Sequence, residues 1–195
     1  MRRFLKGNLD KYLGGRQTER KKEQALIYCE NQQYIHYDKG SLVLYALSDY
    51  LGESVFNKAL SDYLMQVRYR VPYTTSLEFL NAIEKVTPDS LRYYLDDNMS
   101  NITLYDNRII NANCTLQEDG QYRVDLEFQV SKYRSGETGK RIYANAKGDS
   151  LVNKQELIKN QIKSFPLSDY IEVGVFAEHH ENKNGPERML YLQKH

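Results

Sequence analysis

The sequence predicts an α+β chain of two units, an N-terminal all-α helical unit followed by a C-terminal antiparallel β-sandwich. Over the first hundred positions the apolar residues recur at spacings of three and four, which is typical of helices. After about Ser100 the spacing changes to two, which is typical of strands with one solvated face. With 195 residues and a hydrophobic fraction of 41%, the chain can bury a sizeable core. We therefore expect a helical unit over residues 1–100 and a β-sandwich over residues 101–195.

Two helices are expected in the centre of the helical unit. Residues 40–51 are apolar almost all the way round, as in a helix buried on most sides, and Gly52 supplies the stop. In the next segment seven apolar residues share one helical stripe, which predicts an amphipathic helix. They are Val55, Phe56, Ala59, Leu60, Tyr63, Leu64 and Val67.

Start and stop signals place the remaining helices. Thr75 followed by Glu78 makes a capping-box pattern, and Thr87 followed by Pro88 repeats a start signal because proline tolerates the first helical position. Upstream, apolar residues from Phe4 to Leu13 predict a helix that ends at Gly14 and Gly15. The charged stretch from 16 to 23 is expected to be solvated.

The C-terminal half carries a clear strand pattern. Between Tyr122 and Ser131 apolar and polar residues alternate, which predicts a strand of an antiparallel sheet. Asp119 and Gly120 form a turn before it, so residues 109–116 are the expected partner strand of a hairpin. Further strands are expected within 141–146, 158–165, 170–177 and 189–193. Short strands joined by glycine-containing turns suggest a small β-sandwich.

The composition excludes several classes of protein. With 27 basic and 26 acidic residues the net charge is +1, so the whole protein does not steer a nucleic acid or an acidic substrate. No apolar run is long enough to span a membrane, and the first ten residues lack the apolar core of a signal peptide. Cys29 and Cys114 are expected to be free thiols.

Catalytic motifs are scarce. The four histidines lack the H-E-x-x-H spacing of a zinc helix, and there is no C-x-x-C, P-loop or G-x-S-x-G. The run Glu178-His179-His180-Glu181 suggests a metal cluster, but neighbours on a strand point to opposite faces, so a hairpin end is the favoured interpretation.

Basic and aromatic residues also invite binding functions. Four basic side chains, Arg16, Arg20, Lys21 and Lys22, lack interleaved aromatic residues and are offset by neighbouring glutamates. We therefore favour a solvated face over a nucleic-acid partner. Many of the 17 tyrosines fall on core stripes, where a phenol acts as a large amphipathic filler.

One segment carries a family resemblance. The run from Gln32 to Gly40, which contains Tyr37-Asp38-Lys39-Gly40, enters the expected buried helix and is followed by Leu51-Gly52-Glu53 and Phe56. This order resembles the late part of the catalytic domain of gluzincin aminopeptidases, relatives of aminopeptidase N. In that family the tyrosine of Tyr-x-Lys-Gly assists the chemistry through its phenol. The resemblance therefore implies that Tyr37 is a catalytic residue that stabilises the transition state.

The whole chain is similar to one branch of these peptidases, in which the peptidase domain is fused behind an ABC-type transporter permease. The similar segments are 102–107, 172–176 and 190–192. The resemblance implies that residues 1–100 are the remainder of a peptidase catalytic domain and that residues 101–195 are the β-domain behind it. It also implies a parent that is tethered to the cell membrane and cleaves peptides.

The resemblance fails for the metal. The family's zinc ligands and general base precede the tyrosine, yet the 36 residues before Tyr37 hold no H-E-x-x-H. We therefore expect the C-terminal fragment of a larger zinc aminopeptidase. The fragment would be soluble and inactive alone, with no cofactor or metal ligand of its own and no direct membrane insertion. Its partners would be the upstream catalytic and membrane portions of the parent, which would bind zinc and peptide substrate. The alternative is a noncatalytic protein-interaction module on a peptidase-like scaffold.

Overall fold

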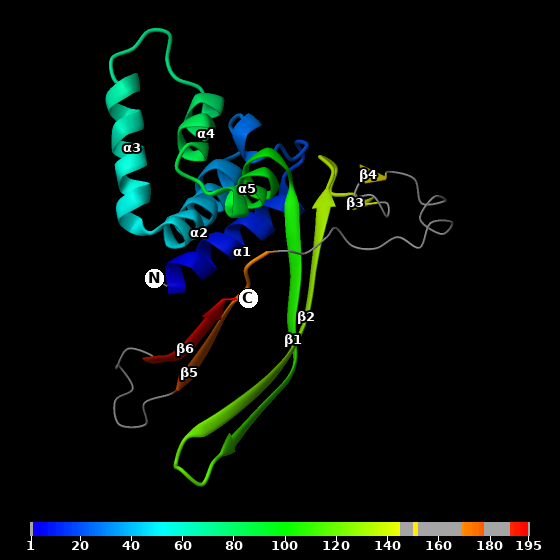
Figure 1. Cartoon of the computed structure of the whole chain (residues 1–195). Coiled ribbons are helices and arrows are strands. Elements are labelled where there is room, and N and C mark those ends of the chain that lie inside the picture. Colours follow the sequence, from blue (N-terminus) through cyan, green and yellow to red (C-terminus); the bar gives the residue numbers. More distant parts are fainter. Residues whose placement is uncertain (1, 145–149, 152–168, 178–187, 195) are drawn as a thin grey trace.

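The computed structural model describes residues 2–144, 150–151, 169–177 and 188–194, and within them the helices come first and the strands follow (Figure 1). The α-helices are α1 (Arg2–Thr18), α2 (Gly40–Leu51), α3 (Glu53–Val67), α4 (Ser76–Glu84) and α5 (Arg92–Leu95). Short 3₁₀ and π-helical turns lie at Leu26–Tyr28, Tyr34–Lys39, Asp89–Leu91 and Asp96–Ser100. None of the helices described has the length and hydrophobicity that a bilayer span needs.

The central helices confirm the sequence predictions. Helix α2 begins at Gly40 and ends at Leu51, and Gly52 after it takes a positive φ of 84°. Helix α4 begins with the predicted capping box. The Thr75 Oγ1 accepts from the Glu78 N–H, and the Glu78 carboxylate accepts from the Thr75 N–H at 2.9 Å. The two bonds satisfy backbone donors that the first turn of a helix leaves unpaired.

Two predicted helix boundaries are wrong. Helix α1 does not end at the glycine pair but continues to Thr18, and Gly15 is instead a point of close approach to the ring of Tyr34. The Thr87 hydroxyl donates to the Ile83 carbonyl at 2.8 Å, so this threonine closes α4 rather than starting the next helix. Pro88 has an extended ψ of 151° and stands just outside the helical turn that begins at Asp89.

The main core lies between α2, α3, α4 and α5. Leu47 is fully buried and Ile83 is 1% exposed. The Tyr94 hydroxyl crosses this core and donates to the Val43 carbonyl at 2.8 Å. Burying one leucine or isoleucine side chain contributes about 1.5–3 kcal/mol, so these contacts rather than local propensity hold the short helices together.

The predicted hairpin is confirmed and is longer than expected. Strands β1 (Thr103–Leu116) and β2 (Tyr122–Ser135) pair antiparallel, with a bulge after Ile109. Strands β3 (Arg141–Ala144) and β4 (Ser150–Leu151) extend the sheet in the order β1-β2-β3-β4. Strands β5 (Glu172–Ala177) and β6 (Arg188–Lys194) form a separate two-stranded sheet. The strand expected within 158–165 lies outside the described residues.

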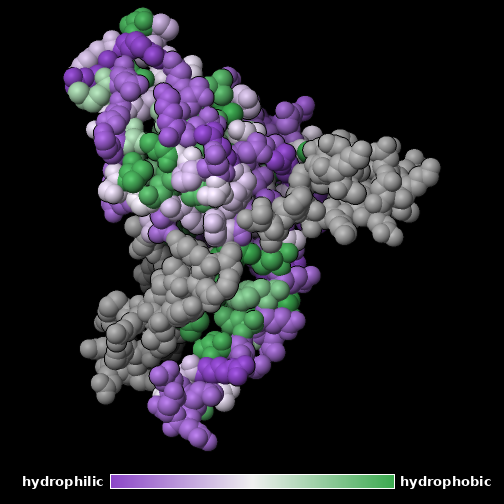
Figure 2. Space-filling view, viewed as in Figure 1, coloured by the Kyte–Doolittle hydropathy of each residue, from purple (hydrophilic) through white to green (hydrophobic). Residues whose placement is uncertain are grey.

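The structure does not show the predicted β-sandwich. Within the described residues the antiparallel sheet is open, and the apolar side of the long hairpin stays largely accessible: Tyr122 is 68% exposed and Leu116 is 60% exposed. Apolar side chains are visible along this hairpin in Figure 2. The alternating pattern therefore predicted a strand with two different faces, but not what covers the apolar one. The division into units at residue 100 stays a prediction.

A buried ion cluster connects the helical residues to the sheet. The Lys132 ammonium of β2 contacts the Asp97 carboxylate at 2.7 Å and the Asp169 carboxylate at 2.8 Å, and each of the three side chains is at most 7% exposed. Arg134 adds a contact to Asp96 at 2.7 Å. The two hydrogen bonds outweigh the burial that would lower the pKa of Lys132, and its pKa is raised. Lys132 therefore stays charged between its two partners.

Candidate functional site

Tyr37 lies in the π-helical turn Tyr34–Lys39 that leads directly into α2. The Gly40 N–H donates to the Ile35 carbonyl, the wide spacing that defines a π turn. The turn sends Ile35 into the core at 0% exposure while Tyr37 is 65% exposed. The rings of His36 and Tyr37 lie 4.5 Å apart between centroids. Among the described residues the Tyr37 hydroxyl has no hydrogen-bond partner, so it is free to donate to a bound molecule.

Helix α1 packs against the inner side of this turn. Gly15 of α1 lies against the Tyr34 ring, because a Cβ at that position would overlap the ring atoms. Tyr12 stacks on Tyr34 with centroids 6.1 Å apart, and the Asn8 amide donates to the Ser41 hydroxyl at 2.5 Å. These contacts fix the inner side of the turn and leave its outer side, with Tyr37, in solvent.

The stretch predicted to be a solvated charged face is exposed from residue 17 to residue 22, but its two end residues, Arg16 and Glu23, turn inward. Glu23 is 5% exposed and its carboxylate accepts from the Tyr12 hydroxyl at 2.8 Å and pairs with Arg16 at 2.7 Å. Arg16 also donates to the Ser135 hydroxyl of β2 at 3.2 Å. The intervening residues 17–22 are all exposed, as predicted. The basic patch therefore loses Arg16 to an internal ion pair, which weakens the nucleic-acid interpretation further.

Lys39 is, after Glu23, the second charged residue of this site that is buried. It is 4% exposed, and its ammonium lies 5.6 Å from the centroid of the Tyr12 ring. Its Nζ makes no hydrogen bond to the part of the chain that the structure describes. Burial lowers the pKa of Lys39 to about 8, against the opposing charge of Glu23. Nothing in the sequence around Lys39 indicates this burial.

The tyrosines beside Lys39 remain neutral. Burial, helped by the negative charge of Glu23, raises the pKa of Tyr34 to about 12 and moves the pKa of Tyr12 higher still. The turn that carries Tyr37 thus rests on the neutral rings of Tyr12 and Tyr34, next to the buried amine of Lys39 and the Arg16–Glu23 ion pair. This layer can position the turn that carries Tyr37.

A metal does not fit the described residues. They contain no group of three histidine, cysteine, aspartate or glutamate side chains that could hold an ion. His36 is the imidazole beside Tyr37, and it has only an aromatic contact there. The run 178–181, which had suggested a metal cluster, lies outside the described residues. Cys29 and Cys114 are free thiols, as expected.

Comparison with known proteins identifies the region around Tyr37. A family model described as "Peptidase family M1 domain" matches residues 16–102. Residues 16–102, called the M1 region below, are therefore similar to a peptidase family M1 domain. The M1 region contains Tyr37, Lys39 and the helices α2 to α5, and its last residue stands just before β1. The match supports the resemblance to this peptidase family that was drawn from the sequence. It does not support the finer resemblance to the branch fused behind a permease. No curated protein and no solved structure matches the chain.

Proposed function

We propose that this chain supplies the transition-state-stabilising tyrosine, Tyr37, to a zinc-dependent aminopeptidase of family M1. The observation that carries the proposal is the exposed phenol of Tyr37, which has no hydrogen-bond partner in the part of the chain that the structure describes and lies on a turn with buried neighbours inside the M1 region. A group that must meet a substrate has to be accessible, and it also has to be held in place. Tyr37 meets both conditions, because its neighbours Ile35 and Lys39 are buried.

The chemistry asked of Tyr37 is electrostatic. When water adds to the carbon of a peptide bond, negative charge develops on the former carbonyl oxygen. A neutral phenol donates a hydrogen bond to that oxygen most strongly when the charge is largest, so it lowers the barrier more than it tightens substrate binding. Removing one such donor costs on the order of 100- to 1000-fold in turnover.

The zinc of this reaction is assigned to another part of the parent protein. Peptidases of family M1 use zinc, but the 195 residues contain no H-E-x-x-H and the described residues contain no metal site. We propose that the zinc ligands and the general base lie outside this chain, which then has no peptidase activity alone. The finer assignment, to a membrane-tethered parent fused behind an ABC-type permease, is part of the same proposal.

The decisive test is made in the protein that carries the zinc segment. We expect Tyr37→Phe to lower turnover of an aminoacyl reporter substrate about 100- to 1000-fold, with zinc content and unfolding midpoint unchanged. Tyr28→Phe is the matched control, because Tyr28 is similarly exposed at 59% and lies in the same M1 region. Full activity of the Tyr37→Phe enzyme would refute the assigned role.

A noncatalytic interaction module is the second candidate. The observation that favours it is the open apolar side of the β1–β2 hairpin, where Ile109 is 59% exposed and Phe128 is 39% exposed. Exposed apolar surface of this kind is typical of a binding face. The reading frame upstream of Met1 separates the candidates: an intact H-E-x-x-H followed by a glutamate supports the peptidase, and a degenerate motif supports the module.

A further inference from the structure

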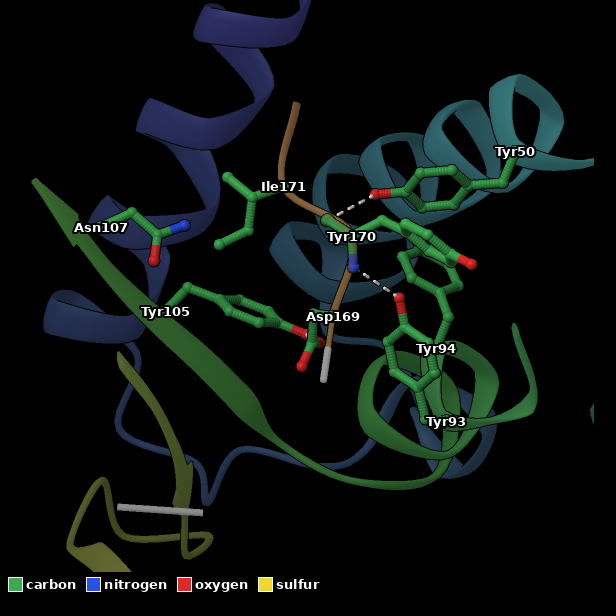
Figure 3. Close-up of a pocket in the computed structure, with 8 residues that line it drawn as sticks. All are labelled: Tyr50, Tyr93, Tyr94, Tyr105, Asn107, Asp169, Tyr170 and Ile171. Atoms are coloured by element: carbon green, nitrogen blue, oxygen red, sulfur yellow. Dashed lines mark hydrogen bonds between the residues drawn. The ribbon is translucent and has the colours of Figure 1, made fainter. Parts of the chain in front are cut away.

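A pocket of about 250 Å³ lies where the helices meet the sheet, and five tyrosine rings surround it. They are Tyr50 of α2, Tyr93 and Tyr94 of α5, Tyr105 of β1, and Tyr170 of the segment that leads into β5 (Figure 3). Asp169 adds a carboxylate to this lining. Aromatic faces carry partial negative charge, so a pocket of rings with one acidic group has the chemistry of a site for an organic cation.

The phenol oxygens of Tyr93, Tyr94 and Tyr105 are engaged in hydrogen bonds at the edges of the pocket. The Tyr94 hydroxyl donates to a backbone carbonyl of α2 at 2.8 Å, and the Tyr105 hydroxyl donates to Asp169 at 3.1 Å. The Tyr93 oxygen accepts from the Tyr170 N–H at 3.0 Å, a bond drawn in Figure 3. Burial raises the pKa of Tyr93 and of Tyr94 above its usual range, so both phenols stay neutral. The surfaces left to a ligand are mainly the rings.

The charges beside the pocket favour a positive ligand. Asp169 and Asp97 share the single ammonium of Lys132, at 2.8 and 2.7 Å. Arg134 contacts Asp97 at 3.3 Å and Asp96 at 2.7 Å. These three carboxylates face two cations, so the cluster carries a net charge of −1, although the Lys132 ammonium already lies 5.6 Å from the centroid of the Tyr93 ring. An anion would meet this charge and the negative ring faces together, whereas a cation is attracted by both.

The size of the pocket limits the ligand. Pockets for drug-sized molecules usually measure about 300–1,000 Å³, and a cavity of about 150 Å³ already holds benzene, so 250 Å³ suits a small ligand of at most about ten heavy atoms. We propose that this tyrosine pocket binds a small alkylammonium ion, which the rings surround and the Asp169 carboxylate attracts. The site is separate from Tyr37 and its assignment does not depend on peptidase activity.

The proposal is tested on the full chain by titrating tetramethylammonium chloride into ¹⁵N-labelled protein and following amide shifts by NMR. We expect saturable shifts that centre on residues 169–171 and on the tyrosines of the pocket. The neutral tert-butanol and the anionic pivalate have similar shapes, and we expect each to bind at least about 10-fold more weakly. Sodium chloride controls for ionic strength. Equal binding of tert-butanol, or the absence of saturable shifts, would overturn the proposal.

Four variants locate the site. Tyr105→Leu removes a ring and should weaken binding about 3- to 30-fold, whereas Tyr105→Phe keeps the ring and should stay within about twofold. Asn107→Lys places a positive charge on an exposed position of the lining and should weaken binding without removing packing. Tyr69→Leu, at a position 96% exposed and remote from the lining, is the control. Unchanged affinity in both Tyr105→Leu and Asn107→Lys would overturn the assignment.

Discussion

Gly15 of helix α1 packs directly against the ring of Tyr34, the first residue of the turn that carries Tyr37. A helix interior normally disfavours glycine, by about 1 kcal/mol relative to alanine. Here the missing side chain is what allows the helix and the turn to approach. The neighbouring Gly14 has no atom within 4 Å of the position where a Cβ would stand. Two adjacent glycines of one helix therefore have opposite structural demands.

Alanine at these two positions should change stability in opposite directions. Gly15→Ala forces its methyl group into the Tyr34 ring, and overpacking of this kind costs about 1–3 kcal/mol. Gly14→Ala meets no atom and should stabilise the protein by up to about 1 kcal/mol through helix propensity. Urea unfolding of both variants measures the difference. A Gly15→Ala protein as stable as Gly14→Ala would show that the close packing does not exist in solution.

The buried amine of Lys39 should give the protein an unusual dependence on pH. Burial lowers its pKa from 10.5 to about 8 in the folded state. Between these values the unfolded chain binds more protons than the folded chain, so stability rises with pH. Below about pH 8 both states are protonated and the full cost of burying the charge applies, on the order of 3 kcal/mol.

Replacing Lys39 by methionine, which keeps the length of the chain, should remove this cost. We expect Lys39→Met to be more stable by about 2–3 kcal/mol at pH 7, with a smaller advantage at pH 9.5. Urea unfolding at the two pH values measures this change. Lys58→Met, at an exposed lysine, should show neither the gain nor the pH effect. An equal pH dependence in wild type and Lys39→Met would contradict the assignment of the titration to Lys39.

Local patterns predicted the elements because local forces set them. The continuous apolar face of residues 40–51 gave α2 with correct ends, and the Thr75–Glu78 spacing gave the start of α4. The alternation after Tyr122 gave the long hairpin. The end of α1 was missed, because in a sequence a glycine that stops a helix looks the same as a glycine that permits close packing.

Long-range contacts defeated prediction at the site. Glu23 and Lys39 are charged, and nothing in their immediate sequence shows that they are buried. Their burial depends on Tyr12 and on Arg16, which also reaches Ser135 of β2. Tyr37 was found by family resemblance, and its exposure agrees with that role without testing it. The alternation of apolar and polar residues in β2 also predicted that one face of the strand is apolar. It could not predict which part of the chain, if any, packs on that face.

Removal of Lys132 should destabilise the junction between helices and sheet. Its ammonium is the shared partner of the buried Asp97 and Asp169 carboxylates. Breaking a buried ion pair by removing one member costs about 3–5 kcal/mol, because the remaining charge is left in a poorly solvated site. Lys132→Met should therefore lower the free energy of unfolding by about this amount. Asp96→Asn, at the exposed end of the same cluster, should cost less than about 1 kcal/mol. Similar losses of unfolding free energy in the two variants would mean that the buried ion pairs stabilise the protein no more than the exposed one.

The first turn of α4 should loosen in acid through Glu78. Its carboxylate accepts from Arg70 at 2.6 Å, Thr74 at 2.9 Å and the Thr75 N–H at 2.9 Å, and these bonds lower the pKa of Glu78 from 4.5 to about 2, the bond from Arg70 most. A depressed acid pKa stabilises the folded state above about pH 4.5, and the effect is lost as the pH falls toward 2.

Amide exchange of α4 measures this loosening. Exchange in the first turn should accelerate between pH 4.5 and 2 beyond its intrinsic pH dependence. Glu78→Gln should remove the acid-dependent part, and Thr75→Ala should destabilise the helix by about 1 kcal/mol at neutral pH. Glu118→Gln, in the turn between β1 and β2, is the control and should leave α4 unchanged. If Glu78→Gln kept the acid transition of the wild type, another carboxylate would have to be responsible. The helix would then be capped by Thr75 alone. The bond from the Glu78 N–H to the Thr75 hydroxyl oxygen does not depend on pH, because neither group titrates.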